Sequence, residues 1–193
     1  MLKERINEVD TIHAPHISES ASDKLYNSIV RIEINNSRGT GFFMKINIKK
    51  NIKYFLLTNE HVIEEKYINS KNTINIFYGK KNNEIQKSIK LDKGQRFIAL
   101  FQGKKDVTVI EILISDDIPE NKYLMADLSY KYGYDIYKEG RFLLAGYPWD
   151  EIYQKERHIA SGKIKKINGI EFEHSIGMAP LECQYVELIV YKL

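Results

Sequence analysis

Hydrophobic and polar residues alternate in short runs from about residue 26 onward. Residues 29–34 alternate as a half-buried strand does, and the polar residues 35–39 that follow are typical of a turn. We expect further strands at 41–48, 53–58, 73–78, 85–91, 97–101 and 107–114, and in the second half at 142–145, 157–161, 163–167 and 170–173. Short strands at regular spacing, without intervening helical periods, predict an all-β barrel or sandwich.

The same pattern divides the chain into an arm and two units. Residues 1–24 mix charged residues, Ser and His with little periodicity, and we expect them to form an N-terminal arm. Residues 25–118 carry the first series of strands, and Pro119 begins a connecting stretch into a second unit at 119–193. A chain of 193 residues with 43% hydrophobic residues can supply cores for two small barrels that share a cleft.

Charge gives little sign of a nucleic-acid partner. The chain has 29 Lys and Arg against 26 Asp and Glu, and the positive residues are scattered in short pairs. A nucleic-acid groove needs a clustered basic stripe with aromatic residues between the charges. We therefore expect no nucleic-acid partner.

Cysteine content and hydropathy suggest the cellular setting. Cys183 is the single cysteine, which excludes an internal disulfide and a Cys-x-x-Cys metal site. No apolar run approaches the ~20 residues that span a bilayer, and the N-terminal residues are charged rather than apolar as in a signal peptide. We expect a cytoplasmic protein with no membrane partner, no metal and no cofactor.

One histidine stands where an apolar strand ends. Phe55-Leu56-Leu57-Thr58 leads into Asn59-Glu60-His61, and a glycine-framed segment, Gly39-Thr40-Gly41, precedes that strand. A histidine held in place by a buried strand suits a general base. Asp106 follows 45 residues later at the start of another apolar strand, where it provides a second fixed acid-base group.

These segments together resemble the trypsin-like serine peptidases of the chymotrypsin fold, in their intracellular and bacterial-type form. The resemblance rests on Gly39-Thr40-Gly41-Phe42, Leu57-Thr58-Asn59-Glu60-His61-Val62 and Asp106-Val107-Thr108-Val109, in that order, and extends over roughly residues 25 to 180. It implies a chymotrypsin-like double β-barrel, hydrolysis of peptide bonds in a protein or peptide substrate, His61 as the base and Asp106 as the acid that orients it.

The nucleophile motif of that family, Gly-x-Ser-Gly, is absent. Counting nine positions past His174, where the family carries its nucleophile, leads to Cys183. A cysteine can replace serine in this fold, and a thiolate paired with His61 is a competent nucleophile. Leu181 and Gln184 stand where the family has glycines, so Cys183 is a candidate by its spacing and not by its motif.

The end of the chain leaves three functions open. Ten residues follow Cys183, so we expect the second barrel to be incomplete at its C-terminus. The chain is then a serine-type endopeptidase homologue made inactive by the loss of its motif, a pseudoprotease that binds peptides or proteins, or a cysteine-nucleophile peptidase that uses Cys183.

Overall fold

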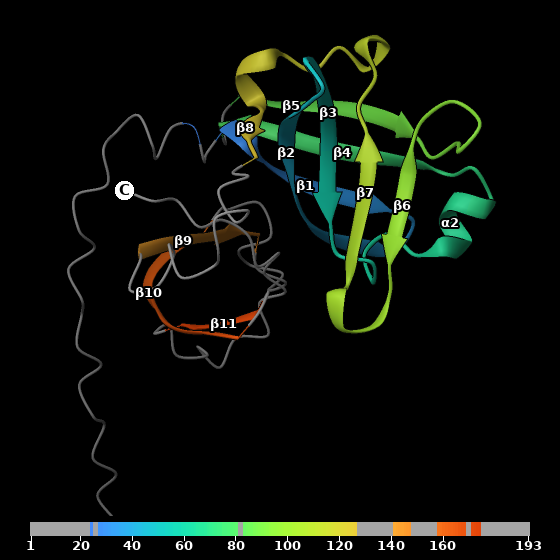
Figure 1. Cartoon of the computed structure of the whole chain (residues 1–193). Coiled ribbons are helices and arrows are strands. Elements are labelled where there is room, and N and C mark those ends of the chain that lie inside the picture. Colours follow the sequence, from blue (N-terminus) through green and yellow to red (C-terminus); the bar gives the residue numbers. More distant parts are fainter. Residues whose placement is uncertain are drawn as a thin grey trace, which may run out of the picture.

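Two β-sheets make up the described part of the molecule (Figure 1). The computed structural model describes residue 24 and residues 27–80, 83–126, 141–147, 158–168 and 171–174. The strands of the larger sheet are β1 (Ile29–Ile34), β2 (Ser37–Ile48), β3 (Asn51–Thr58), β4 (Thr73–Lys80), β5 (Asn83–Lys90), β6 (Ile98–Phe101), β7 (Val107–Glu111) and β8 (Leu124–Met125). The smaller sheet contains β9 (Arg141–Gly146), β10 (His158–Asn168) and β11 (Glu171–His174).

Antiparallel pairing dominates both sheets. The larger sheet has the order β5-β4-β1-β2-β3-β7-β6, with the short β8 paired in parallel to β2, and the smaller has the order β11-β10-β9. The expected all-β class is confirmed. No pairing between described residues joins β5 to β6, so hydrogen bonding does not close the larger sheet.

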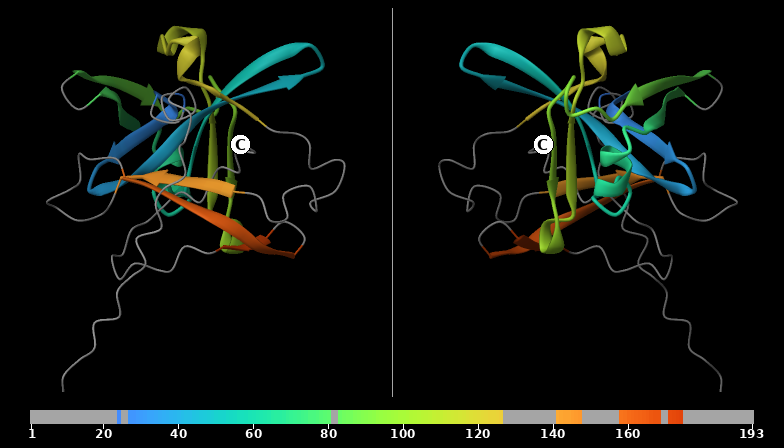
Figure 2. Two further views of the ribbon diagram at one scale, coloured as in Figure 1. Left: turned by 90° about the vertical axis from the view of Figure 1, so that its left-hand side faces the viewer. Right: turned by 90° about the vertical axis from the view of Figure 1, so that its right-hand side faces the viewer.

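Two tight hairpins connect the first three strands. Ile34 pairs with Ser37 across a two-residue loop, so β2 begins four residues earlier than the expected 41–48. The second loop, Lys49 and Lys50, lies where a turn was expected, and both residues have positive φ, 48° and 72°. Positive φ at both central residues matches the right-handed twist of paired strands. The resulting β2–β3 hairpin projects from the sheet (Figure 2).

The core lies against one face of the larger sheet. Alternate residues of the strands point into it, which explains why the sequence pattern of period two located most strands correctly. The side chains buried most deeply include Ile32, Phe43, Leu56, Ile76, Tyr78 and Ile110. Phe43 meets Tyr78 edge to face, with ring centroids 5.7 Å apart. Full burial of one such side chain contributes about 1.5–3 kcal/mol.

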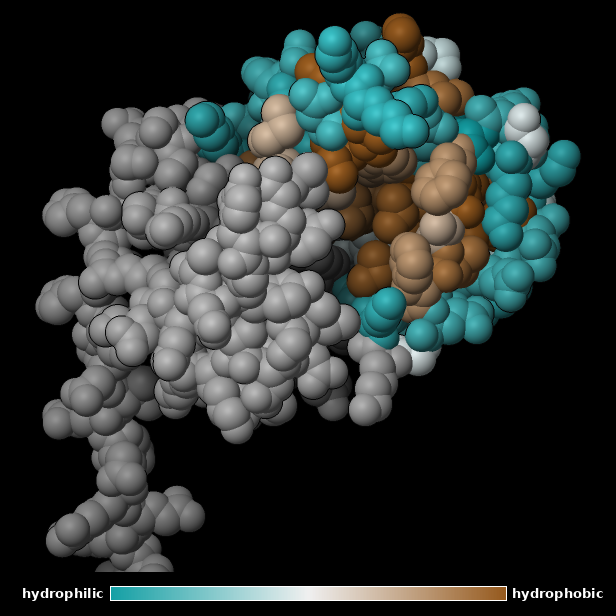
Figure 3. Space-filling view, in the orientation of Figure 1, coloured by the Kyte–Doolittle hydropathy of each residue, from teal (hydrophilic) through white to brown (hydrophobic). Residues whose placement is uncertain are grey.

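The opposite face of β3, β7 and β6 is also apolar. Figure 3 shows hydrophobic side chains gathered over these strands. Phe55 on β3 contacts Phe97, just before β6, with ring centroids 6.4 Å apart, and Phe97 remains 56% exposed. Phe101 at the end of β6 is 43% exposed.

Several elements differ from the sequence expectations. A short helix, α2 (Glu65–Asn69), was not expected; it is anchored by Ile68, which is buried in the core. β7 ends at Glu111 rather than at 114, because a 3-10 turn follows at Ile114–Asp116. The two strands expected at 157–161 and 163–167 form one continuous strand, β10, whose pairing with β11 shifts register between Ile164 and Lys166.

No helix among the described residues is long and apolar enough to cross a membrane. The division into an arm and two units at residues 25 and 119 stays a prediction. Hydrogen bonds join β8 to the larger sheet, since Met44 pairs with Leu124 and the Ala126 N–H donates to the Lys45 carbonyl at 2.8 Å.

A charged pair between β3 and β7 includes the last residue of β7. The Glu111 carboxylate accepts the Phe97 N–H at 3.0 Å and the Lys53 ammonium at 2.9 Å. Both bonds lower the pKa of Glu111, and the bond from the Phe97 backbone has the larger effect. A lowered folded-state pKa stabilises the fold above the pKa of the unfolded chain, and that contribution is lost as pH falls through the folded-state value.

A buried ion pair fixes the chain after β7. Asp116 accepts two hydrogen bonds from the Arg96 guanidinium, at 2.7 and 3.0 Å, and the two side chains are only 8% and 4% exposed. Arg96 also donates to the Glu111 carbonyl at 2.9 Å, and the Leu113 N–H donates to Asp116 at 2.7 Å. The pair therefore ties the approach to β6 to the exit from β7.

Replacement of Asp116 by asparagine should strongly destabilise the fold, because Arg96 would be left buried without its counter-ion. We expect the free energy of unfolding to fall by about 3–5 kcal/mol, measured by denaturant titration. Asp117→Asn is the matched control: this neighbour is 87% exposed and pairs with Lys87 at the surface, so its midpoint should stay close to that of the wild type. Equal effects of the two variants would contradict a structural role for the buried pair.

Candidate acid-base site

The site forms where β3 ends beside the start of β7. The two strands are antiparallel, and Thr58 on β3 is the register partner of Thr108 on β7. Residues just after Thr58 therefore lie beside residues just before Thr108. This pairing brings His61 next to Asp106 although 45 residues separate them in the sequence.

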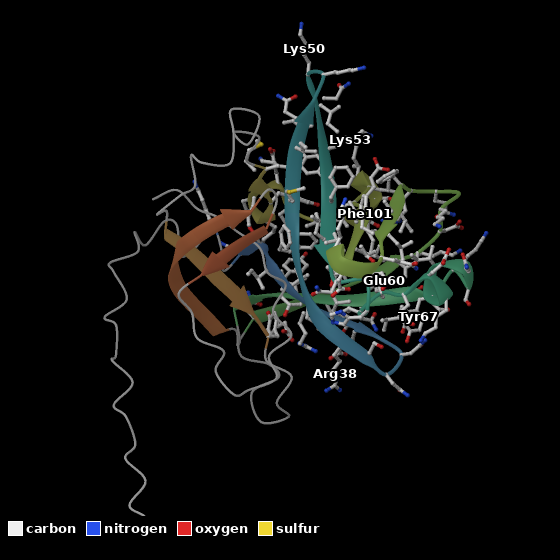
Figure 4. All side chains as sticks on the ribbon, turned by 60° about the horizontal axis from the view of Figure 1, so that its bottom comes forward. Arg38, Lys50, Lys53, Glu60, Tyr67 and Phe101 are labelled. Carbon is white, nitrogen blue, oxygen red and sulfur yellow. The ribbon has the colours of Figure 1, made fainter. Side chains whose placement is uncertain are left out.

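A tight turn presents His61. The Asn59 carbonyl accepts the N–H groups of Val62 and Ile63 at 3.2 and 3.3 Å. Val62 and Ile63 are 1% and 0% exposed, whereas the His61 side chain is 41% exposed. Val62 and Ile63 thus anchor the turn in the core and leave the imidazole accessible. In Figure 4, Glu60, which precedes His61, lies far from Lys50 at the tip of the β2–β3 hairpin.

Both ends of this turn are held by buried threonines. The Thr58 hydroxyl donates to the Thr40 carbonyl at 2.8 Å, and the Thr108 hydroxyl donates to the Ile63 carbonyl at 3.1 Å. Thr58 and Thr108 are 1% and 0% exposed. Because a buried hydroxyl needs a partner, these bonds fix the turn against β2 and β7.

Asp106 reaches His61 from an unusual backbone conformation. It caps the 3-10 turn Gly103–Lys105 and has φ 43° and ψ 52°, in the left-handed region. Its carboxylate is 36% exposed and accepts two hydrogen bonds from the same histidine. The His61 backbone N–H donates to Oδ1 at 3.0 Å, and Nδ1 lies 2.6 Å from Oδ2.

This arrangement selects one tautomer of the imidazole. A carboxylate can only accept, so the neutral ring carries its proton on Nδ1 and keeps the lone pair on Nε2. Within the described part of the chain, Nε2 has no hydrogen-bond partner. His61 can therefore take up a proton at Nε2, and the resulting imidazolium would lie against the Asp106 carboxylate.

The structure brings together two of the three predicted site residues. His61 and Asp106 form the pair, and Cys183 lies outside the described residues. Sequence reasoning did not predict roles for the Asn59 carboxamide or the Thr108 hydroxyl. Asparagine at the end of a strand reads equally well as an ordinary turn residue, so the direction of its side chain was not visible in the sequence. No cluster of His, Cys, Asp or Glu that could hold a metal occurs among the residues described.

The glycine-framed segment has a packing role beside the site. A Cβ atom on Gly39 would lie 2.4 Å from Cγ2 of Val62, which is the residue after His61. A Cβ on Gly41 would lie 2.6 Å from Ile32 and 2.9 Å from the Leu57 carbonyl. Thr40, between the two glycines, accepts the Tyr147 N–H on its hydroxyl at 2.8 Å, which links the larger sheet to the end of β9.

Comparisons with known proteins find a distant structural neighbour. No protein family model matches the chain, and no curated protein matches it. Among solved structures, the chain is similar to Rv3671c from M. tuberculosis H37Rv, crystallised as a serine-to-alanine mutant in an inactive form. The two share 14% identity with a TM-score of 0.43, over 76% of this chain and 53% of that chain. This chain thus spans about half the length of that structure.

Alanine at position 39 should push Val62 away and disturb the turn that carries His61. We expect Gly39→Ala to lower the unfolding midpoint, because its Cβ cannot fit against the Val62 methyl groups. In the double variant Gly39→Ala with Val62→Ala those methyl groups are gone, so the loss should be smaller than the sum of the single losses by about 0.5–3 kcal/mol. Strictly additive losses in this double-mutant cycle would show that the contact does not limit the substitution.

Proposed function

We propose that this chain is a homologue of the trypsin-like peptidases, with the chymotrypsin-like arrangement, whose acid-base pair is His61 and Asp106. The observation that carries the proposal is the double hydrogen bond between them, with Nδ1 2.6 Å from one carboxylate oxygen and the backbone N–H 3.0 Å from the other. The bond at Nδ1 defines the tautomer and the orientation of the ring, and the backbone bond holds the carboxylate in place to accept it. That is what a general base in acyl transfer requires.

The proposed chemistry is hydrolysis of a peptide bond. Nε2 of His61 takes the proton from the nucleophile, the nucleophile attacks the scissile carbonyl, and the imidazolium returns the proton to the leaving amine. Asp106 stabilises the imidazolium meanwhile. In this chain the candidate nucleophile is the Cys183 thiol, which would form a thioester that water then cleaves.

An exposed aromatic residue beside the pair supports a peptide ligand. Phe101 pairs in register with Val107, the residue after Asp106, and is 43% exposed. Extended peptides bind proteins through apolar contacts of alternate side chains as well as main-chain hydrogen bonds. The same surface supports the second candidate, a pseudoprotease that binds peptides without turnover.

Removal of the base separates these candidates. We expect His61→Ala to lower hydrolysis of a fluorogenic peptide library by about 10²–10⁴-fold, the usual contribution of general acid-base catalysis. Glu60→Gln is the matched control, since the neighbouring side chain contacts Gln102 at 3.5 Å rather than the pair, and it should keep its activity. Hydrolysis that survives in the alanine variant would overturn the assignment.

Alkylation of the thiol tests the nucleophile. A thiolate paired with imidazolium reacts with iodoacetamide at mildly acidic pH, where an ordinary thiol is almost unreactive. We expect Cys183 to be labelled at pH 6, and the labelling to slow at least tenfold in His61→Ala because the ion pair is lost. Labelling that does not depend on His61 would exclude Cys183 as the nucleophile. Peptide binding without turnover in the wild type would then favour the pseudoprotease.

A further inference from the structure

We propose that Asn59 is a positioning residue whose carboxamide holds Asp106 in the backbone conformation that directs its carboxylate at His61. The inference rests on the proposed function for its catalytic consequence. We call the contact between the Asn59 carboxamide and Asp106 the clamp. It is observed between described residues, and the resemblance to peptidases did not require it.

The Asn59 side chain contacts both the carboxylate and the backbone of Asp106. Its Nδ2 lies 3.1 Å from Oδ2 of Asp106 and 3.3 Å from the Asp106 carbonyl oxygen. One amide group can donate two protons, so a single side chain can satisfy both acceptors. It therefore links the direction of the carboxylate to the conformation of the main chain behind it.

Asp106 needs such a restraint because its backbone lies in the left-handed region, with φ 43° and ψ 52°. Residues other than glycine occupy that region at an energetic cost, and they persist there where the surroundings hold them. Glycine would accept the conformation freely but carries no carboxylate. A donor aimed at the carbonyl of this residue favours the strained conformation over its alternatives.

The carboxylate is then restrained by a single turn. Oδ2 receives the Asn59 amide at 3.1 Å and faces Nδ1 of His61 at 2.6 Å, while Oδ1 receives the His61 N–H at 3.0 Å. A carboxylate oxygen has room for two donors, so Asn59 does not displace the histidine. Without Asn59 the carboxylate keeps only donors from His61 among the described residues, and nothing described holds its carbonyl.

Asn59 is fixed in turn by the element that carries His61. Its carbonyl accepts the N–H groups of Val62 and Ile63, and both of these residues are buried in the core. Any movement of Asn59 is therefore coupled to the His61 turn. The clamp sets the distance between acid and base and takes no direct part in proton transfer.

The proposal predicts a change in the hydrogen bond between His61 and Asp106. In wild-type protein labelled with ¹⁵N-histidine, proton NMR at acidic pH should show the Nδ1–H of His61 far downfield, as a short charge-assisted bond requires. Asn59→Leu keeps a side chain of similar size but has no donor, and Asn59→Asp keeps the shape but, when ionised, can only accept. We expect both variants to move this resonance upfield or to broaden it beyond detection.

A matched control separates the effect of a new negative charge from the effect of losing the Asn59 donor. Gln102→Glu makes the same amide-to-carboxylate change on a residue that bonds to Glu60 and not to Asp106, and it should keep the downfield resonance. Asp106→Asn should abolish the resonance and thereby assign it. A resonance unchanged in Asn59→Leu or in Asn59→Asp, with the folded state verified by the unfolding midpoint, would overturn the clamp.

Kinetics extend the test to positioning. In an active protein, Asn59→Leu should lower kcat about ten- to a hundredfold and leave the KM for peptide close to the wild-type value, because misplacement of a reacting group slows chemistry more than binding. A rise in KM of the same size, with kcat unchanged, would overturn a positioning role. If the wild type has no activity, the NMR result still decides the clamp, so failure of the proposed function and failure of this inference remain distinct.

Discussion

Residues that are 45 positions apart meet in this protein because β3 and β7 pair as antiparallel neighbours, with Thr58 opposite Thr108. A shift of this register by one residue would turn every side chain of one strand to the other face of the sheet. Leu56 would leave the core if β3 shifted, or Ile110 if β7 shifted, and both are fully buried, which makes either shift costly. The hydrophobic core thus sets the register, and the register sets the distance between His61 and Asp106.

The site combines a rigid support with exposed chemistry. Val62, Ile63 and Thr108 are buried, and they hold a turn whose one accessible imidazole points to an accessible carboxylate. The absence of a side chain at Gly39 serves the same support, because β2 approaches Val62 more closely than any Cβ would allow. Packing on one side of the turn and hydrogen bonding on the other leave the ring few alternatives.

The acid and the base of the proposed peptidase come from one sheet. In that proposal the nucleophile has to arrive from the second half of the chain, and the hydrogen bond from the Tyr147 N–H to Thr40 is a described link between the halves. Thr40 belongs to the same glycine-framed segment that supports the His61 turn. A disturbance at this segment would therefore reach the acid-base pair and the docking of the second half together.

The sequence alone determined the strands of the first half and the identity of the candidate pair, because alternation with period two follows directly from burial of one strand face. It placed His61 and Asp106 at strand ends, but it could not place them at 2.6 Å from each other. It also missed the start of β2 at Ser37, which depends on the partner strand, and the continuity of β10 across the expected strands at 157–161 and 163–167. The direction of the Asn59 side chain and the left-handed backbone of Asp106 were decided by tertiary structure, since both depend on which strand lies beside which and no local pattern records that.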